Sequence, residues 1–571
     1  MKNRLFAGLL AAVLLLALSV SSMAEVNPNA GQGLYTGTAE KNAITLRITT
    51  MSKMNPILQT YSNEFSIDRH IFDNLVKVSP EDNSVIPGAA ESWEVSEDGK
   101  TWTFHLRPGQ KWVNSKGEVV ADVTANDFVF GWRELLNPMN AAEYGYYGEA
   151  FKNGKAYIDY VNAEDKTGLT EVTMDDIAIR AEDDLTLVCE LENYLPYFLD
   201  YVKFEVMAPI YEPFYTEVGA ENYGTSPETL LYNGPFYMTE WVLENRITVE
   251  KNSAWWNADQ VEVEKINFVK YTDSDTCLNA FMAGELDETD ITGEQRALLE
   301  ADGYKAISYP SGYSYIFWAN TTDYGDIRSK SLRKAISAAL DRQQIIDVVY
   351  QNSNLVSPCF TFGINGVSTP TFGEAVVAAN SGNGLYNPHA DVELAQSYLP
   401  AALEELGYTD VSQIDVTLMT NDNTQVKRVS EVVQEQVRKA LGIELKIEVL
   451  SITECRARRK AKQYDLFFGG WGPDYNDPMT DLELFYSTVG NNHPGYNNPE
   501  YDALIDAARQ ETDMAAREKY FIQAESIILE DQPVIPIFWQ YEDYVVSDKL
   551  LEGFGRLPFQ AMNFIYTKLA K

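Results

Sequence analysis

Strand patterns and helix patterns alternate along most of this chain, and this alternation limits the fold more than any other feature of the sequence. A strand-like run at 415–421 (DVTLMTN) is followed by helical spacing over 426–441, where valines recur on one face. Two more strand-like runs come next, at 443–450 (IELKIEVL) and 464–471 (YDLFFGGW). Strands and helices in this βαβ-like order indicate an α/β protein.

The N-terminal half carries the same mixture of patterns. Alternating apolar residues predict a strand at 43–50, and two strands flank the turn at 96–100 (SEDGK). Apolar residues at helical spacing predict helices over 68–76 and 124–136, the second of which begins at a Thr/Asn cap. The same spacing predicts one continuous amphipathic helix within 329–351.

The first residues of the chain read as an export signal. In the segment 1–24, two basic residues precede an apolar run over 5–20, and Ser22 and Ala24 then fit a small-residue cleavage site. The alternative is an uncleaved anchor, although this run is short for a span of about 20 residues. No cysteine stands near the site, so a lipid-attachment signal is absent. We expect cleavage after Ala24 and a mature protein outside the cytoplasm, in the periplasm or secreted.

Charge and motifs exclude several functions. The chain has 84 acidic and 45 basic residues, a formal net charge of −39, and such a polyanion repels phosphate backbones. We therefore expect no nucleic-acid partner. The sequence contains no G-x-S-x-G elbow, H-E-x-x-H pair or phosphate loop. Neighbouring acids such as Asp474 and Asp477 resemble a glycosidase pair only in sequence, so we expect no enzyme; an exported hydrolase is the alternative from another class.

Cysteine and histidine are rare and scattered. The cysteines are Cys189, Cys277, Cys359 and Cys455, and the histidines are His70, His105, His389 and His493. Cys189 lies in an apolar run and is expected to be a small buried hydrophobe. The sequence leaves the disulfide state of the four cysteines open. No spacing suggests a metal site, and no cofactor is expected.

The stretch 469–478 (GGWGPDYNDP) follows a run typical of a buried strand but contains three glycines and two prolines. Glycine permits close backbone approach. The carboxylate of Asp474 can only accept hydrogen bonds and therefore calls for a cationic partner. This stretch suggests a place where something approaches a strand and brings a positive charge.

Three aromatic clusters are flanked by glycine: 143–148 (EYGYYG), 311–318 (SGYSYIFW) and the GGWGPDY run. Ordinary core and turn packing explains most aromatic residues in a domain. Large, stiff side chains with a polar tip also suit a concave binding surface. Tyr315, in the second cluster, is therefore a candidate ligand-binding residue.

Six fragments in a fixed order resemble one family. They are 85–112, 124–138, 233–257, 333–346, 469–478 and 496–508. Together they resemble the extracytoplasmic solute-binding proteins of peptide ABC transporters, the oligopeptide-binding proteins of the peptide/nickel class. Each fragment is weak alone, but the set spans nearly the whole mature chain.

The resemblance implies an α/β, periplasmic-binding-protein-like two-lobe fold of type II with an additional inserted domain, three domains in all. The implied boundaries are 25–72, 210–311 and 541–571 for a discontinuous domain I, 73–209 for the inserted domain II, and 312–540 for domain III. The two lobes are expected to close on ligand by a hinge.

The resemblance also implies a site. Members of the family hold an extended peptide between protein strands, a mode called β-augmentation. Gly470, Trp471 and Gly472 match one such strand, and Tyr61 and Ser62 match its counterpart on the other lobe.

Further positions match family residues near the ligand. Asp474 matches the aspartate that holds the peptide α-ammonium, through a charge-assisted hydrogen bond. Tyr144 matches a tyrosine at the ligand. Asn491 and Arg459 match positions near side-chain pockets and the peptide carboxylate.

Two departures bear on ligand choice. Gly472 stands where some members carry a cysteine, and Phe468 stands where some carry a basic residue, so one partner for the peptide carboxylate is absent. We expect a monomeric receptor with an oligopeptide ligand and membrane ABC permease subunits as partners. A dipeptide, a nickel complex or a sugar are the alternatives within the family.

Overall fold

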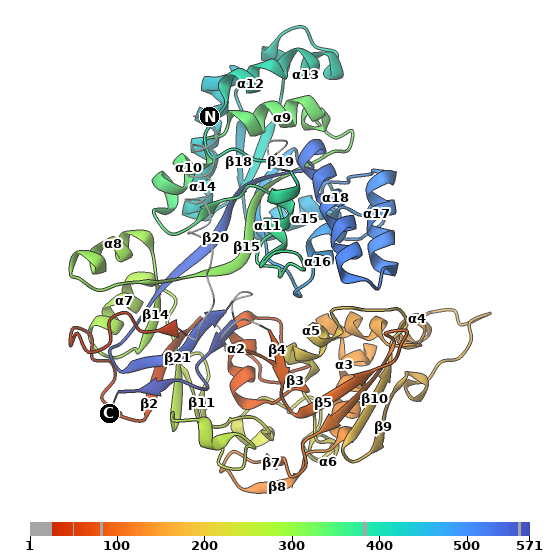
Figure 1. Ribbon diagram of the computed structural model, residues 1–571, viewed down its shortest axis with the longest axis vertical. Helices are drawn as coiled ribbons and strands as arrows, with labels where there is room; N and C mark the ends of the chain where they lie inside the picture. The colour runs from red at the N-terminus through yellow and green to blue at the C-terminus, as the bar shows by residue number, and fades with distance from the viewer. Residues whose placement is uncertain (1–24, 50, 80–83, 381–384, 558–560, 571) are drawn as a thin grey trace, which may run out of the picture.

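The computed structural model describes residues 25–49, 51–79, 84–380, 385–557 and 561–570. It has two lobes, one above the other in Figure 1, and two long strands run from one lobe to the other. These strands are β15 (Ile307–Ala319) and β20 (Val534–Val546), which pair antiparallel with each other. The export signal predicted at 1–24 lies outside the described residues.

One mixed sheet extends through both lobes because β15 and β20 belong to it. Its order is β11-β12-β13-β2-β14-β20-β15-β19-β17-β18, and a short strand also pairs with β20. The lower-lobe strands are β11 (Phe236–Val242), β12 (Arg246–Lys251), β13 (Lys265–Lys270), β2 (Ala43–Ile48) and β14 (Glu288–Ile291). The upper-lobe strands are β19 (Leu466–Trp471), β17 (Thr417–Asn421) and β18 (Lys446–Leu450), with β16 (Leu355–Val356) beside β20.

The ladder between β15 and β20 is interrupted where the strands cross between the lobes. Tyr309 pairs with Glu542 and Pro310 with Tyr541, and regular pairing resumes only at Ser314. Proline lacks the N–H group that a ladder needs, which accounts for part of the interruption. Side chains beside this crossing therefore lie at the boundary of both lobes.

The lower lobe also contains the residues between β2 and β11, which form a second sheet in the order β5-β6-β10-β9. Trp102, Phe104 and Leu106 of β6 share one buried face, as predicted. The strands here are β3 (Val76–Val78), β4 (Val85–Pro87), β5 (Ala90–Val95), β6 (Thr101–Leu106), β7 (Lys111–Val113), β8 (Val119–Asp122), β9 (Ile179–Asp183) and β10 (Thr186–Glu190).

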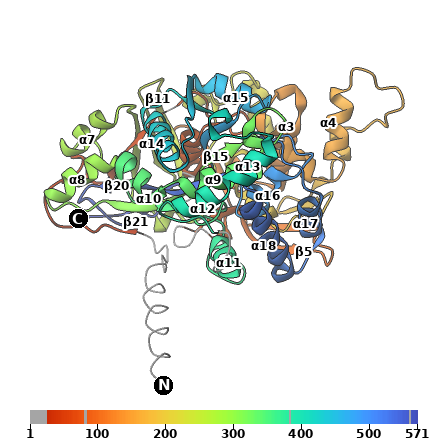
Figure 2. The same ribbon diagram turned by 90° about the horizontal axis from the view of Figure 1, so that it is seen from above.

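Helices complete the lower lobe. They are α2 (Ser62–Ile71), α3 (Ala125–Leu136), α4 (Gly154–Asn162), α5 (Phe198–Lys203), α6 (Glu212–Val218), α7 (Ser274–Met282) and α8 (Gly293–Ala301). A capping box formed by Thr124 and Asp127 begins α3, which confirms the predicted start. α4 and the loop after it project to one side in both views (Figures 1 and 2).

In the upper lobe, helices cover both faces of the sheet (Figures 1 and 2). Phe317 packs toward α9 and α14, whereas Ile316 and Trp318 pack toward α17 and α18. Successive side chains of a strand point to opposite faces, so one strand supplies both cores. The helices are α9 (Lys330–Ala339), α10 (Arg342–Ile345), α11 (Phe372–Ala379), α12 (Val392–Ser397), α13 (Leu399–Leu406), α14 (Thr424–Leu441), α15 (Ile452–Lys460), α16 (Met479–Leu482), α17 (Pro499–Gln510) and α18 (Met514–Asp531).

A last small sheet lies at the end of the chain. It joins β1 (Glu25–Val26), β21 (Leu550–Leu557), β22 (Ala561–Asn563) and β23 (Lys568–Leu569).

Two predicted helices are wrong in extent. The helix predicted within 329–351 is broken at Leu340, and Asp341 caps a second helix by accepting from the Gln344 N–H. The buried guanidinium of Arg342 donates to the carbonyl oxygens of Ser337 and Pro536, which fixes the break.

The helix predicted over 68–76 begins earlier and ends at Ile71, and Val76 belongs to β3. Asp73, just beyond the helix, accepts hydrogen bonds from the indoles of Trp255 and Trp256. These long-range contacts hold the chain in an extended path that helical spacing cannot reveal.

The hydrophobic clusters separate the two lobes. One cluster joins the lower-lobe sheet with residues of the segment 73–209 and extends to Tyr309 and Tyr544. Two others lie on the two faces of the upper sheet. The domain boundaries proposed from the resemblance stay predictions, and the segment 73–209 shares its core with the rest of the lower lobe.

The cysteines are all buried and unpaired in the structure, and Cys189 is a fully buried strand residue, as predicted. Within the described part of the chain, no helix is long and apolar enough to cross a membrane. No group of three or more potential ligands among those residues is arranged to hold a metal ion.

Candidate ligand-binding cleft

The end of β19 presents an open strand edge. On one side β19 pairs with β15, including Gly470 with Tyr315 and Trp471 with Ser314. On the other side β17 pairs only with Leu466 and Phe467. Among the described residues no strand pairs with Gly470 or Trp471 on that side. An unpaired edge can accept another extended chain.

Two glycines of this segment lie close against the protein's own tyrosines, and the contact at position 472 leaves no room for a Cβ atom. A Cβ atom on Gly472 would lie 2.6 Å from the ring of Tyr313. A Cβ atom on Gly470 would lie 3.3 Å from the ring of Tyr315. The Tyr315 ring stacks on Phe538 with centroids 4.9 Å apart, so it belongs mainly to the upper-lobe core.

Asp474 lies in the loop after β19 and is exposed to solvent, while its backbone N–H donates to the Thr480 hydroxyl at 2.9 Å. Although solvent reaches this side chain, surrounding protein displaces part of the water around its carboxylate, and this desolvation raises the pKa of Asp474 to about 6. Among the described residues no lysine, arginine or histidine forms an ion pair with this carboxylate. Its carboxylate has the properties of an acceptor for a cationic group.

Tyrosines surround Asp474 from both lobes. Burial, and then the charge of Asp474, raises the pKa of Tyr144 to about 12. Tyr144 belongs to the 3₁₀ segment Glu143–Ala150 of the lower lobe, where its ring contacts Phe65 and Phe204. The pKa of Tyr313 is raised by burial and by the same charge. Asp474 therefore faces a tyrosine-rich space between the lobes.

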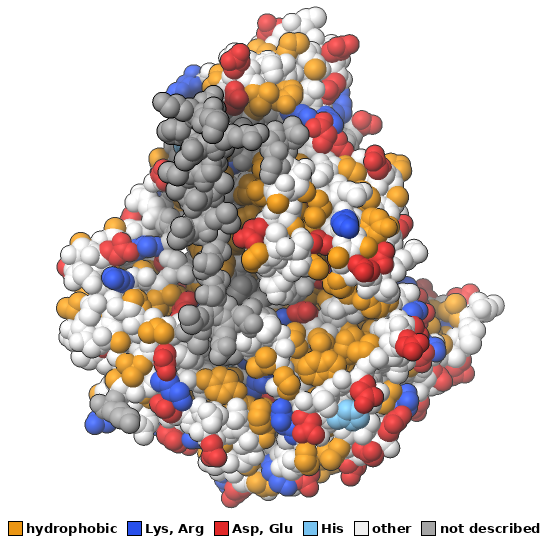
Figure 3. Space-filling model, viewed as in Figure 1, with side chains coloured by type: hydrophobic (Ala, Val, Ile, Leu, Met, Phe, Trp, Pro, Cys, Tyr) orange, Lys and Arg blue, Asp and Glu red, His pale blue; other side chains and the backbone are white. Residues whose placement is uncertain are grey.

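Next to Asp474 the two lobes touch. The ring of Tyr475 stacks on that of Tyr197, with centroids 4.1 Å apart and planes inclined by 7°. The Tyr475 hydroxyl donates to Glu483 at 3.2 Å. Figure 3 shows hydrophobic side chains gathered where the upper and lower lobes meet.

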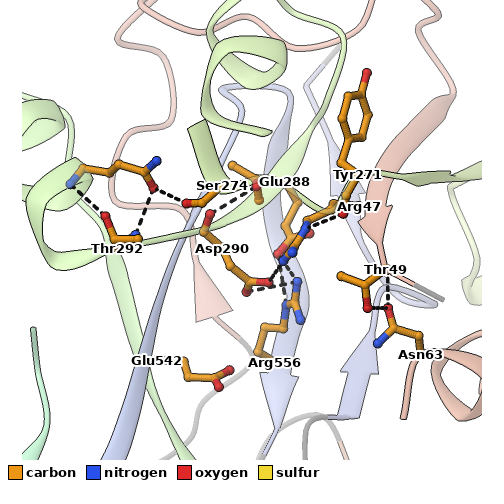
Figure 4. Close-up of polar contacts among 12 residues, drawn as sticks. Arg47, Thr49, Asn63, Tyr271, Ser274, Glu288, Asp290, Thr292, Glu542 and Arg556 are labelled. Carbon is orange, nitrogen blue, oxygen red and sulfur yellow. Dashed lines mark hydrogen bonds and ion pairs between the residues drawn. The ribbon is translucent and has the colours of Figure 1, made fainter. Parts of the chain in front are cut away.

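Tyr61 and Ser62 stand at the start of α2 in the lower lobe. Tyr61 is exposed, and Ser62 lines a polar cavity. Thr49 and Asn63, which line the same cavity, are labelled in Figure 4. No hydrogen bond among the described residues joins either of them to the loop of Asp474. The two predicted ligand-contacting segments thus lie on different lobes.

Arg459 and Asn491 form a separate part of the upper lobe. The Arg459 guanidinium lies over the rings of Trp318 and Phe467, at 5.5 and 5.2 Å. Its Nε atom is buried without a hydrogen-bond partner, and burial lowers the pKa of this guanidinium. Asn491 is exposed, and its carbonyl accepts from the N–H of His493.

His493 links these two predicted residues. Burial and the charge of Arg459 lower the pKa of His493 to about 4. The structure therefore brings Arg459 close to the 491–493 segment. No contact among the described residues joins either predicted residue to Asp474.

Trp471 is half-buried against the α17–α18 core and lies close to Asp481. Sequence reasoning missed four residues near Asp474: Tyr313, Tyr197, Tyr475 and Glu483. Tyr313 and Tyr475 belong to the glycine-flanked aromatic clusters, which is the signal that could have found them. Tyr197 and Glu483 carried no such signal, because only the packing of the two lobes places them there.

Comparison with known proteins identifies the family. Residues 84–493 match the family described as bacterial extracellular solute-binding proteins, family 5 Middle. The chain belongs to this family of solute-binding proteins, and the resemblance found in the sequence is confirmed. The two-lobe, type II periplasmic-binding-protein-like α/β fold is confirmed with it.

Three similar proteins illustrate the relationship. The oligopeptide-binding protein OppA of Bacillus subtilis is 30% identical over 508 residues, covering 88% of this chain and 87% of the relative. The substrate-binding domain of an oligopeptide ABC transporter from Bacillus anthracis superimposes with a TM-score of 0.71 at 28% identity, covering 94% of this chain and 100% of that one. Haemophilus influenzae OppA in complex with RPPGFSPFR superimposes with a TM-score of 0.72 at 25% identity. The match covers 94% of this chain and 100% of that one.

Proposed function

We propose that this protein is an extracytoplasmic receptor that captures oligopeptides between its two lobes and delivers them to an ABC permease. The observation that carries the proposal is the carboxylate of Asp474, which has no cationic partner among the described residues and lies beside the open edge of β19. The α-ammonium and the backbone are common to all peptides. A site built for those two features binds peptides without demanding a sequence.

The proposed contacts follow from these two features. The peptide backbone adds a strand at Gly470–Trp471–Gly472, and its α-ammonium donates to Asp474. Tyr144 lines the space from the lower lobe, as do Tyr61 and Ser62. Arg459, with its unsatisfied Nε atom, and Asn491 serve ligand groups further along the upper lobe.

The relatives support this ligand class. One is named for oligopeptide binding, and a structural relative was solved with a nine-residue peptide, RPPGFSPFR. We propose a monomer without enzymatic activity, exported by a signal cleaved after Ala24. A dipeptide, a nickel complex or a sugar is the alternative ligand, and an exported hydrolase is the remote one.

Calorimetric titration with one peptide in free and N-acetylated forms tests the proposal. Acetylation removes the charge that Asp474 would hold, so the acetylated peptide should bind far more weakly. Equal affinities would remove Asp474 as the ammonium site. Small-angle scattering should also show a smaller radius of gyration with bound peptide, because closing lobes bring their centres together.

A further inference from the structure

A polar cavity of about 140 Å³ lies in the lower lobe, next to the strands that cross between the lobes (Figure 4). It opens at the carboxyl end of β2, beside the first turn of α2. Thr49, Ser62 and Asn63 line one side, and Tyr309 and Glu542 line the side of the crossing strands. Arg47, Asp290 and Arg556 complete the charged lining. The volume is sufficient for several water molecules or the polar end of a long side chain.

The charges around this cavity do not balance. Arg47 donates to Asp290 at 2.5 Å, and Arg556 donates to Glu288 at 2.6 Å. Arg556 also lies 3.3 Å from Asp290. With Glu542 included, three carboxylates share two guanidinium groups.

Glu542 is the carboxylate left without a cation. Among the described residues it forms no ion pair, and in Figure 4 no dashed line joins it to either guanidinium. It accepts a hydrogen bond from the hydroxyl of Tyr309, its cross-strand neighbour. Burial and the charge of Asp290 raise the pKa of Glu542, while Arg556 and Arg47 lower it only in part.

The cavity adjoins the proposed path of the peptide at Ser62. Burial, and then the charges of Asp474 and Glu542, raise the pKa of Tyr313, which belongs to the crossing strand β15. Ser62, proposed above as a ligand contact, lines the cavity directly. A peptide strand laid beside Ser62, as proposed above, would therefore pass the mouth of this cavity.

We propose that this cavity is a side-chain pocket that selects a cationic residue, lysine or arginine, of the bound peptide, with Glu542 as its charge partner. This inference rests on the proposed function. An entering ammonium group supplies the positive charge that the three carboxylates lack. The hydroxyl oxygens of Ser62 and Thr49 supply further acceptors for its remaining N–H groups.

Ten pentapeptides test the inference. Five consist of alanine with a single lysine at a different position, and five carry norleucine, which keeps the apolar stem and lacks the ammonium group. At one of the five positions, the wild type should bind the lysine peptide with a Kd roughly tenfold to a hundredfold lower than that of the norleucine peptide. This is the range expected for a charge-assisted hydrogen bond. Glu542→Gln should abolish this preference, so that the lysine and norleucine peptides bind the variant with equal affinity.

Two controls accompany the titrations. Glu250→Gln removes an acid from β12, away from the cavity, and should keep the lysine preference. In Glu542→Gln the new side-chain amide oxygen can still accept the hydrogen bond from Tyr309, so thermal unfolding should be close to that of the wild type.

The outcomes separate the two proposals. Peptide binding with no lysine preference at any position, or with a preference that survives Glu542→Gln, overturns the cationic pocket and leaves the peptide receptor standing. If none of the ten peptides binds the wild type, both proposals are wrong.

Discussion

Asp474 and Asp477 stand three residues apart in one loop, yet their surroundings differ completely. Asp477 is 4% exposed, and its two oxygens accept from both terminal nitrogens of Arg517, which is 2% exposed. Asp474 faces the space between the lobes and has no cationic partner among the described residues. A paired, buried aspartate maintains the structure, whereas an unpaired one in a cleft is available for a ligand. The two can therefore be separated by experiment.

The largest effect should come from Asp477→Ala. This change leaves the Arg517 guanidinium buried without its carboxylate, and breaking such a pair typically costs about 3–5 kcal/mol of stability. Denaturant unfolding followed by tryptophan fluorescence measures the loss. Asp474→Ala, which removes no protein partner, should leave the midpoint close to that of the wild type. Equal destabilisation by the two changes would remove the contrast between them.

Asp474→Ala should instead act on ligand affinity. The lost interaction is a hydrogen bond to a charged group, worth about 1.5–3 kcal/mol, or roughly a ten- to hundredfold weaker Kd. Titration with free and N-acetylated peptide checks this. Because acetylation breaks the same interaction from the other side, the two losses should not add. Fully additive losses would show that the ammonium group and Asp474 act independently.

Peptide affinity should also depend on pH. Burial raises the pKa of Asp474 to about 6 in the unliganded protein, and the proton competes with the ammonium group of the ligand. Affinity should be full above pH 7 and fall as pH drops through 6, by about tenfold at pH 5, since each unit below a pKa costs about a factor of ten. Titrations of the wild type and Asp474→Asn between pH 5 and 8 measure this. A wild-type curve parallel to that of the variant contradicts the assignment.

The raised pKa of Asp474 affects folding stability in the direction opposite to its effect on peptide affinity: stability falls, whereas affinity rises, as pH increases. A carboxyl group whose folded pKa is raised binds its proton more tightly in the folded state, so it favours folding at low pH and opposes it as pH rises through about 6. Asp474→Asn should therefore not destabilise the protein at pH 7.

The smallest effect should come from Tyr197→Ala. It removes the ring that stacks on Tyr475 where the lobes touch, and aromatic pairs contribute about 0.5–1.5 kcal/mol beyond area burial. Peptide affinity should fall a few-fold, and scattering should show a larger radius of gyration. Tyr160→Ala, on the projecting helix α4, serves as the matched control and should change neither quantity. A normal radius in Tyr197→Ala would mean that the stack does not hold the lobes together.

Much of the local structure follows from the sequence because its causes are local. The strand β19, the helix α14 and the capped start of α3 lie where apolar periodicity and capping residues put them. The break after Leu340 cannot be predicted from local sequence, because it depends on Arg342 donating to the carbonyl oxygen of Pro536, far along the chain. The end of α2 cannot be predicted locally either, because it depends on the indoles of Trp255 and Trp256, which donate hydrogen bonds to Asp73.

The candidate site likewise has some features that can be predicted from the sequence and others that depend on tertiary contacts. Residue types and their order alone show that a glycine-rich strand end leads into Asp474, because that motif is continuous in the chain. Tertiary contacts give Asp477 its partner Arg517, leave Asp474 without a cationic partner among the described residues, and place Tyr144 and Tyr313 around Asp474. The same packing places Glu542 beside Arg47, Arg556 and Asp290 around one cavity. The balance of charge around a carboxylate depends on groups tens to hundreds of residues away, and only the packing of the chain brings them within reach.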